Sequence, residues 1–188
     1  EDPDVWVGCG RPAIKLLNRH RKVFPAARFV YVQDPRTHHD RFDLIVAPGH
    51  DRVRAPNAIS MIGSPHRVSA ERLERDTAAF AERIAALPSP RAAVMIGGPS
   101  KRFKITQAVS DNLETRIGDL LGAGYGVMLS VSRRTPGGLT RRLKARYGDD
   151  KRVWLFDGEG DNPYFAFLHY ADQILVTEDS ANMAAEAA

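Results

Sequence analysis

The chain has 188 residues, of which 43% are hydrophobic and 27% are charged, as is usual for a soluble globular protein. Its formal net charge of +4 comes from scattered basic residues without a nucleic-acid-binding motif, which argues against nucleic acid as a partner. The single cysteine, Cys9, excludes an internal disulfide, and the sequence has neither a run of about 18 apolar residues nor a secretory signal. We therefore expect a cytoplasmic protein. Because the sequence lacks an initiator methionine and ends within a predicted helix, we also expect a segment of a longer one.

The first half of the chain alternates short apolar runs with turns, which is typical of a largely parallel sheet buried on both faces. The runs predict strands over residues 5–10, 28–33, 43–47 and 58–62. A helix is predicted from Arg11 to Phe24, since proline is favoured at a first helical position. Its basic side chains could bring peripheral association with anionic lipid at the inner membrane face, but a solvated helix face is the simpler interpretation. These side chains are Lys15, Arg19, Arg21 and Lys22.

Polar side chains follow the predicted strands of this half. His50 and Asp51 come directly after the third strand, and open parallel sheets bind ligands beyond the carboxyl ends of their strands. The pair is therefore a candidate general base with its neighbour, and a structural role is the alternative. The run His38-His39-Asp40 carries metal-ligating side chains, but adjacent residues point in different directions and no ligand spacing repeats, so no metal site is predicted.

The clearest helix is predicted between Ser69 and Leu87, where apolar side chains recur along one stripe. The break Pro88-Ser89-Pro90 follows it and is the best candidate for a domain boundary. Four strand–helix units come after this break, with strands predicted over residues 92–97, 126–131, 152–156 and 173–177. This alternation predicts a doubly wound α/β domain.

Three polar segments of the second half follow predicted strands and carry candidate ligand-binding residues. Gly97, Gly98 and Ser100 lie in a glycine turn whose backbone N–H groups could approach a phosphate, although the turn is not a Walker A loop. Arg133 and Arg134 could clamp a diphosphate, or they could form salt bridges with Asp or Glu. The acidic glycine loop over residues 157–164, which includes Asn162, could contact a base or ribose, or be a simple turn.

The last predicted strand leads into a polar turn and an alanine-rich helix with Asp179 or Ser180 as its N-cap. Unpaired N–H groups and the helix dipole would favour a phosphate at this helix start. Asn182 and Glu186 lie four residues apart and share one face of the helix, where the carboxylate could hold sugar hydroxyls. An ordinary capped helix with a solvated Glu186 is the alternative.

A set of seven short motifs spans nearly the whole chain and resembles the mitochondrial-fission Elm family, which has many bacterial members. Those members are often labelled nucleoside-diphosphate-sugar epimerases. The motifs are Cys9-Gly10-Arg11, Gln33-Asp34-Pro35, Pro48-Gly49-His50-Asp51, Gly97-Gly98-Pro99-Ser100, Ser132-Arg133-Arg134-Thr135, Gly158-Glu159-Gly160-Asp161-Asn162-Pro163-Tyr164 and Val176-Thr177-Glu178-Asp179-Ser180.

The resemblance implies an α/β fold with two Rossmann-like, doubly wound parallel-sheet domains, similar to GT-B glycosyltransferases and both incomplete in this sequence. Residues 1–87 would be the C-terminal part of the first domain with its connecting helix. Residues 88–188 would be the second domain without its C-terminal end. In GT-B proteins the second domain usually binds the nucleotide-sugar, with an acidic helix residue near the ribose, and Glu186 is at the matching position. Asn182 stands where a small hydroxyl residue is expected, which slightly weakens the phosphate assignment there.

Two classes of function follow from these features. The first is a nucleotide-sugar-dependent enzyme, a glycosyltransferase or a nucleoside-diphosphate-sugar epimerase, with His50 or Asp51 as its base. Its ligand would be a nucleoside diphosphate or the corresponding sugar conjugate, and no tightly bound cofactor is expected. The second is a non-catalytic scaffold, since plant members of the family recruit division machinery to mitochondria. The oligomeric state stays open.

Overall fold

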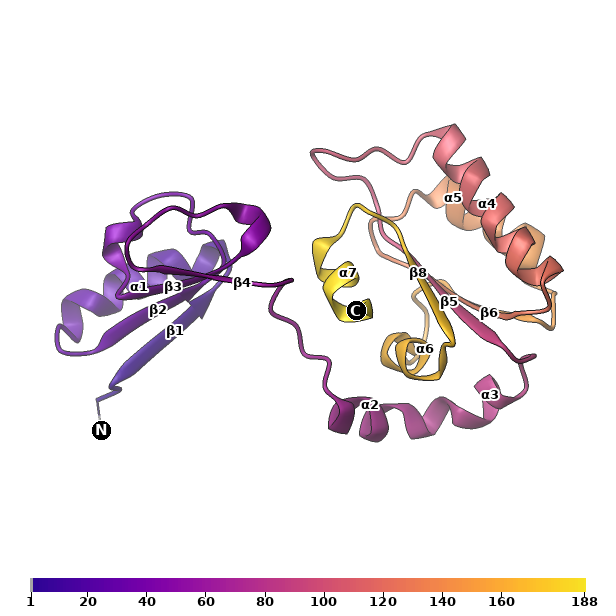
Figure 1. The fold of residues 1–188 in the computed structure, drawn as a ribbon, viewed down its shortest axis with the longest axis horizontal. Coiled ribbons are helices and arrows are strands. Elements are labelled where there is room, and N and C mark those ends of the chain that lie inside the picture. Colours follow the sequence, from indigo (N-terminus) through magenta and orange to yellow (C-terminus); the bar gives the residue numbers. More distant parts are fainter. Residues whose placement is uncertain (1) are drawn as a thin grey trace. The chain divides into compact units, whose positions relative to one another are not determined.

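The computed structural model describes residues 2–188, which divide into two compact units, one up to His66 and one from Arg67 to Ala188 (Figure 1). Each unit is built on a four-stranded parallel sheet with interleaved helices. The predicted α/β class with two Rossmann-like sheets is therefore confirmed. No helix in this described part of the chain is long and apolar enough to cross a membrane.

The first unit has the strand order β1-β2-β3-β4, so each strand lies beside the one that precedes it in the sequence. Every strand matches its predicted range to within one residue at each end. The strands are β1 Val5–Cys9, β2 Arg28–Val32, β3 Leu44–Pro48 and β4 Ala58–Met61. Helix α1, Arg11–Val23, connects β1 to β2. The later connections contain the short 3-10 helices η1, His39–Arg41, and η2, Gly49–Asp51.

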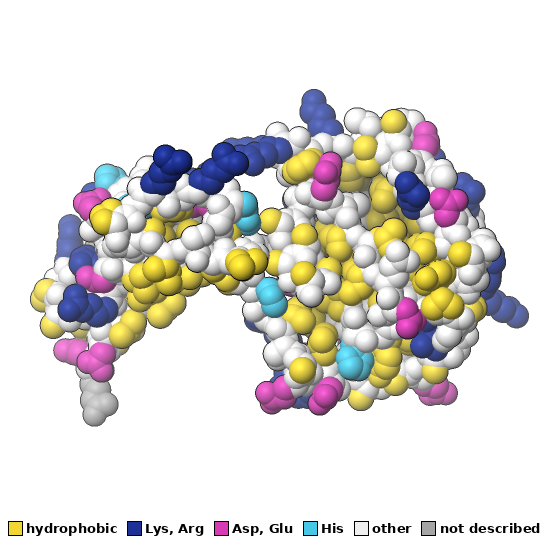
Figure 2. Space-filling view, in the orientation of Figure 1, with side chains coloured by type: hydrophobic (Ala, Val, Ile, Leu, Met, Phe, Trp, Pro, Cys, Tyr) yellow, Lys and Arg dark blue, Asp and Glu magenta, His cyan; other side chains and the backbone are white. Residues whose placement is uncertain are grey.

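The core of the first unit lies on one face of its sheet. Phe29, Tyr31 and Ile45 are almost completely buried there, and they pack with Leu17 of α1. Successive side chains of a strand point to opposite faces, so the neighbours of these residues belong to the other face. Figure 2 shows hydrophobic side chains gathered along the side of this unit where β1 lies.

The second unit has the strand order β7-β6-β5-β8 and is wound in both directions. Its strands are β5 Arg91–Ile96, β6 Gly126–Val131, β7 Val153–Phe156 and β8 Gln173–Val176, again within one residue of the predicted ranges. Its helices are α2 Ala70–Thr77, η3 Ala78–Phe80, α3 Ala81–Ala85, α4 Gln107–Gly122, α5 Gly137–Tyr147, α6 Tyr164–Tyr170 and α7 Ala181–Ala187. The chain advances from β5 to β7 and then returns to the far side of β5.

This reversal places helices on both faces of the second sheet (Figure 1). On one face, Ile117 of α4 and Leu143 of α5 are completely buried against β5 and β6. On the other face, Phe167 of α6 packs edge-on against Trp154 of β7, with their ring centroids 4.9 Å apart. Both faces are therefore closed by apolar contacts.

The boundary between the units lies earlier in the chain than Pro88, where the sequence placed it. The connecting helix, assigned to the first domain, packs with the second unit, because Ile84 and Leu87 are buried in the cluster around Trp154. The guanidinium of Arg83 also lies 4.1 Å from the Trp154 ring centroid. The predicted single helix is in addition interrupted by η3. The prolines of Pro88-Ser89-Pro90 thus show where this helical segment ends, but they do not show with which unit it packs.

We expect Ile84→Ala to lower the free energy of unfolding of the second unit by about 2–5 kcal/mol, because it opens a cavity at a residue that is 1% exposed. Chemical denaturation, followed by tryptophan fluorescence with Trp6 replaced by Phe so that Trp154 alone reports, would measure the change. Val109→Ala on α4, where the side chain is 40% exposed, should change it by less than about 0.5 kcal/mol. A loss as small as that of Val109→Ala would contradict the packing of Ile84 in the cluster around Trp154.

Candidate functional site

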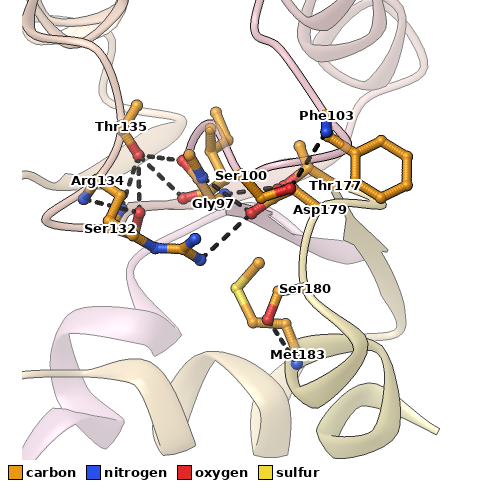
Figure 3. A network of polar contacts seen from close by, with 12 residues as sticks. Gly97, Ser100, Phe103, Ser132, Arg134, Thr135, Thr177, Asp179, Ser180 and Met183 are labelled. Atoms are coloured by element: carbon orange, nitrogen blue, oxygen red, sulfur yellow. Dashed lines mark hydrogen bonds and ion pairs between the residues drawn. The ribbon is translucent and has the colours of Figure 1, made fainter. Parts of the chain in front are cut away.

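Polar residues gather beyond the carboxyl ends of β5, β6 and β8, with Asp179 at their centre (Figure 3). The Asp179 side chain is only 4% exposed. It accepts hydrogen bonds from the Gly98 N–H at 3.0 Å and from the Thr177 hydroxyl at 2.6 Å, and it lies 3.4 Å from Nη2 of Arg134. The Thr177 oxygen in turn accepts a hydrogen bond from the Gly97 N–H at 2.8 Å. A buried carboxylate is thus held by groups from three different strand ends.

The glycine turn after β5 is closed by this network. The Gly97 and Gly98 N–H groups, predicted to approach a phosphate, donate to Thr177 and Asp179 instead. A methyl group on Gly97 would overlap the Asp179 carboxylate, and one on Gly98 would overlap the main chain of Arg134. The glycines therefore permit this close approach of the loops, while their role toward a ligand stays a prediction.

The two serines predicted to bind phosphate accept hydrogen bonds from backbone N–H groups of their own loops. Ser100 Oγ accepts hydrogen bonds from the N–H groups of Arg102 and Phe103, at 3.3 and 3.2 Å. Ser180 Oγ accepts from the Met183 N–H at 3.3 Å and is the N-cap of α7, a helix of seven residues. Ser180 is therefore the N-cap, and the Asp179 side chain belongs to the network between the loops.

The paired arginines after β6 have different surroundings. Arg134 pairs with Asp179, which agrees with the salt-bridge alternative for this residue. Its neighbour Arg133 is exposed and has no ionic partner among the residues that the structure describes. A strand-end arginine without a carboxylate partner is the one of the two that is available to an anionic ligand.

Arg133 lies at a pocket of about 450 Å³ beyond the carboxyl ends of β5, β6 and β7. The pocket combines apolar side chains with a few polar ones, as small-molecule sites do. Its lining consists of Met95, Ile96, Ser130, Val131, Ser132, Arg133, Phe156, Asp157, Gly158, Gly160, Asn162, Tyr164 and Met183. Asp157 forms an ion pair with Lys144 at 2.8 Å, and this hydrogen bond lowers the pKa of the Asp157 carboxyl.

Beside the pocket, Tyr164 of α6 and Glu186 of α7 are joined by a short hydrogen bond. The Tyr164 hydroxyl donates to Oε2 of Glu186 at 2.6 Å. Burial raises the pKa of Tyr164 above its ordinary value, and the hydrogen bond to Glu186 raises it further. Glu186, the predicted ribose ligand, therefore already holds a hydroxyl group. Asn182 is exposed on the same helix.

The loop before α6 holds Asn162 against the pocket. Its Oδ1 accepts a hydrogen bond from the Tyr164 N–H at 3.0 Å, which leaves the side-chain amide N–H₂ free to donate. Sequence reasoning singled out Asn162 and Glu186 but missed Tyr164, which connects the two. The sequence signals for it were its position directly after the Asn-Pro helix start and its place at the end of the Gly158–Tyr164 motif.

In the first unit, the structure separates the two predicted catalytic residues. His50 is exposed on η2, whereas Asp51 lies 3.7 Å from Nη2 of Arg36. Arg36 also contacts Asp34 at 3.4 Å, and Asp34 lies 3.1 Å from Nε2 of His39. Asp51 thus belongs to a network with Asp34 and His39 that sequence reasoning did not connect.

The backbone of this network is unusual, because Gln33, Arg36, His38 and Arg52 all have positive φ angles. Such conformations are uncommon for residues other than glycine, and no pattern in the sequence predicted them. Within residues 2–188, no group of three or more His, Cys, Asp or Glu side chains is arranged to hold a metal ion.

Comparison with known proteins gives a family and a fold. A family model described as Mitochondrial fission ELM1 matches residues 1–188. Mitochondrial fission protein ELM1 of Arabidopsis thaliana is 26% identical over 211 residues, which cover 100% of this chain and 49% of that protein. UDP-GlcNAc 2-epimerase from Methanocaldococcus jannaschii matches with a TM-score of 0.63 at 13% identity, over 98% of this chain and 58% of that chain. The structural match shows a GT-B-like fold, and the chain spans about half the length of the curated relative.

We expect Asp179→Ala to cost about 1–3 kcal/mol of stability, because it leaves the buried Gly98 N–H without an acceptor. Urea denaturation would measure this change. Glu178→Ala, at the exposed neighbouring position, should stay within about 0.5 kcal/mol of the unchanged protein. An Asp179 variant as stable as the Glu178 variant would mean that the network contributes nothing.

We expect Tyr164 to ionise above the ordinary tyrosine pKa of 10.0. Because the folded-state pKa is raised, the stability it contributes is fully present below the unfolded value and is lost as pH rises through the folded value. The ultraviolet absorbance of tyrosinate, taken as the difference between the unchanged protein and Tyr164→Phe, would follow this ionisation. Glu186→Gln should remove only part of the shift, since burial is the larger cause. Ionisation of Tyr164 at or below pH 10 would contradict the contact.

Proposed function

This chain belongs to the mitochondrial fission ELM1 family, and we propose that it binds a nucleoside diphosphate or the corresponding nucleotide-sugar in the pocket of its second unit. The single observation that carries this proposal is the pocket itself, which lies beyond the carboxyl ends of β5, β6 and β7. Arg133 is part of its lining and has no ionic partner within residues 2–188. Ligands of doubly wound sheets bind at this edge.

The size and lining of the pocket support a ligand with one flat apolar part and one anionic part. Its volume of about 450 Å³ falls within the range of about 300–1,000 Å³ that is usual for small-molecule sites. Met95, Phe156 and Met183 offer apolar contacts to a base, while the Asn162 amide offers hydrogen-bond donors. Asp157 in the lining and Glu186 beside the pocket, which already accepts from Tyr164 through Oε2, offer carboxylate oxygens to ribose hydroxyls.

Arg133 is the proposed diphosphate ligand. A guanidinium donates several N–H groups in a planar arrangement that suits phosphate oxygens, and Arg133 has no carboxylate of its own to satisfy in the described part of the chain. Arg134 has a different task in this proposal, since it holds Asp179. The β6 loop is thereby fixed directly beside Arg133.

If the protein is an enzyme, we propose a glycosyltransferase reaction first and an epimerase reaction second. In the transfer, the acceptor oxygen forms a bond to the sugar while the bond between the sugar and the diphosphate breaks. Arg133 would stabilise the negative charge on the leaving diphosphate. A general base takes the proton of the acceptor hydroxyl in such a reaction, and the assignment of that base to His50 or Asp51 stays a prediction. The alternative is a binding or scaffold protein without turnover, which the name of the Arabidopsis relative, a mitochondrial fission protein, favours.

The proposal predicts that nucleoside diphosphates raise the melting temperature of the purified full-length protein. Ligand at about 100 times its dissociation constant should add about 2.7 kcal/mol of stability. The free nucleosides should act much more weakly, because Arg133 acts on phosphate charge. Arg133→Ala should cost about 1.5–3 kcal/mol of binding, or about 10- to 150-fold in affinity, measured by titration calorimetry.

Arg141→Ala is a matched control, because Arg141 is an exposed arginine on α5 outside the pocket lining. It should leave the affinity unchanged. Equal losses of affinity for both variants would mean that the net positive charge of the protein, and not the position of Arg133, determines binding. If no nucleoside diphosphate or nucleotide-sugar of a panel raises the melting temperature, the proposal is wrong. Binding without hydrolysis or transfer would select the scaffold.

A further inference from the structure

A hollow of about 540 Å³ lies on the first unit, where the last two turns of α1 meet the end of η1. Its volume falls within the range of about 300–1,000 Å³ that is usual for small-molecule sites. Four of its five lining residues are basic and none is acidic. The lining consists of Asn18, Arg19, Arg21, Lys22 and Arg41. A basic helix face is usually solvated, but here it lines a hollow to which a second element adds a further cation.

Arg21 fixes the two sides of this hollow to each other. Its guanidinium donates hydrogen bonds to the Asp43 carboxylate at 3.0 and 3.3 Å and to the Arg41 carbonyl oxygen at 3.1 Å. Asp43 also accepts a hydrogen bond from the Phe29 N–H at 2.8 Å. Because Asp43 directly precedes β3 and Phe29 lies at the start of β2, the hollow lies at the amino edge of the sheet. It is therefore separate from the strand-end residues of the carboxyl edge.

The other three cations of the lining have no partner. Arg19, Lys22 and Arg41 are exposed, and within residues 2–188 their side chains form neither an ion pair nor a hydrogen bond. Side chains three residues apart on a helix, such as Arg19 and Lys22, have Cβ atoms about 5–6 Å apart, which is less than the Debye length of about 8 Å at physiological ionic strength. Their mutual repulsion is therefore only partly screened, and a bound anion would relieve it.

The dipole of α1 explains part of this arrangement. Cations in the last turn of a helix interact favourably with the negative end of the dipole, and Lys22 lies in that turn. The dipole does not explain the Arg41 side chain, which η1 brings to the same hollow. Convergence of unpaired cations from two elements is instead what an anion site requires.

We propose that this hollow binds a ligand that carries two or more phosphate groups. The basic side chains of the lining can only donate hydrogen bonds, so the ligand has to supply the acceptors. Phosphate oxygens suit the planar guanidinium groups of Arg19 and Arg41, and a second phosphate allows Lys22 to be neutralised as well. A soluble polyphosphate and a lipid headgroup with two phosphates present the same chemistry. The proposal is independent of nucleotide binding by the second unit.

Titration calorimetry with inorganic tripolyphosphate tests the soluble ligand. The full-length protein should carry Arg133→Ala, which removes the proposed phosphate ligand of the second unit. We expect saturable binding, and Arg19→Ala combined with Lys22→Ala should weaken it at least about tenfold, because two charge-assisted contacts are lost. The control combines Arg141→Ala with Lys151→Ala, which removes the same charges at exposed positions outside the lining. It should leave the affinity unchanged.

Cosedimentation with vesicles tests the lipid headgroup. The vesicles consist of phosphatidylcholine with about one fifth cardiolipin, whose headgroup carries two phosphates and is bound by basic pockets of other proteins. Vesicle binding that Arg19→Ala with Lys22→Ala abolishes, and that the control pair retains, would support the proposal and identify a lipid as the source. Binding of tripolyphosphate alone, with the same dependence on these residues, would support it and identify a soluble ligand.

Three results would overturn the proposal. The first is that neither tripolyphosphate nor the vesicles bind. The second is that binding persists unchanged in the variant without Arg19 and Lys22. The third is an equal loss in that variant and in the control pair, because net positive charge and not the hollow would then determine binding.

Discussion

The buried carboxylate of Asp179 is the contact on which the carboxyl edge of the second sheet depends. A charge removed from water is costly unless hydrogen bonds and an opposite charge replace its hydration. Gly98, Thr177 and Arg134 provide these, and they come from the loops after β5, β8 and β6. Because one side chain joins three loops, their mutual position is fixed before any ligand arrives. The part of the pocket that these loops line is therefore already formed without a ligand.

The two sheets differ in the order in which the chain forms their strands, and this order determines which faces of each sheet are covered by helices. In the second unit the return to β8 closes both faces and brings α7 next to the pocket through Met183. In the first unit the strands advance in one direction, and the core grows on one face only. The direction of winding, more than the composition of the strands, thus determines which apolar surfaces stay open.

The strands were predictable because buried parallel strands are short apolar runs that end at glycine, proline or charged residues. The domain boundary was not, because the strong break at Pro88 is a local signal, while the burial of Ile84 beside Trp154 is a contact between distant parts of the chain. The strand-end positions of the site residues were also predictable.

Their partners were not predictable from the sequence. Arg133 and Arg134 are equivalent in the sequence, and only the position of Asp179, 45 residues after Arg134, separates their roles. Likewise, Asp51 and His50 are neighbours in the chain, yet the 3-10 helix η2 brings only Asp51 toward Arg36. Local patterns thus identified the sheet edge, and tertiary contacts assigned the individual side chains along it.

The Asp179 network also has a consequence for the order in which the protein is made. The Gly98 N–H and its acceptor are 81 residues apart in the chain. At synthesis rates of about 5–20 residues per second, a nascent chain that has just completed the glycine turn waits roughly 4–16 seconds for Asp179. During that time the Gly97 and Gly98 N–H groups lack the acceptors that they have in the folded protein. The edge that carries the pocket is therefore completed only after the ribosome has passed the last strand of the sheet.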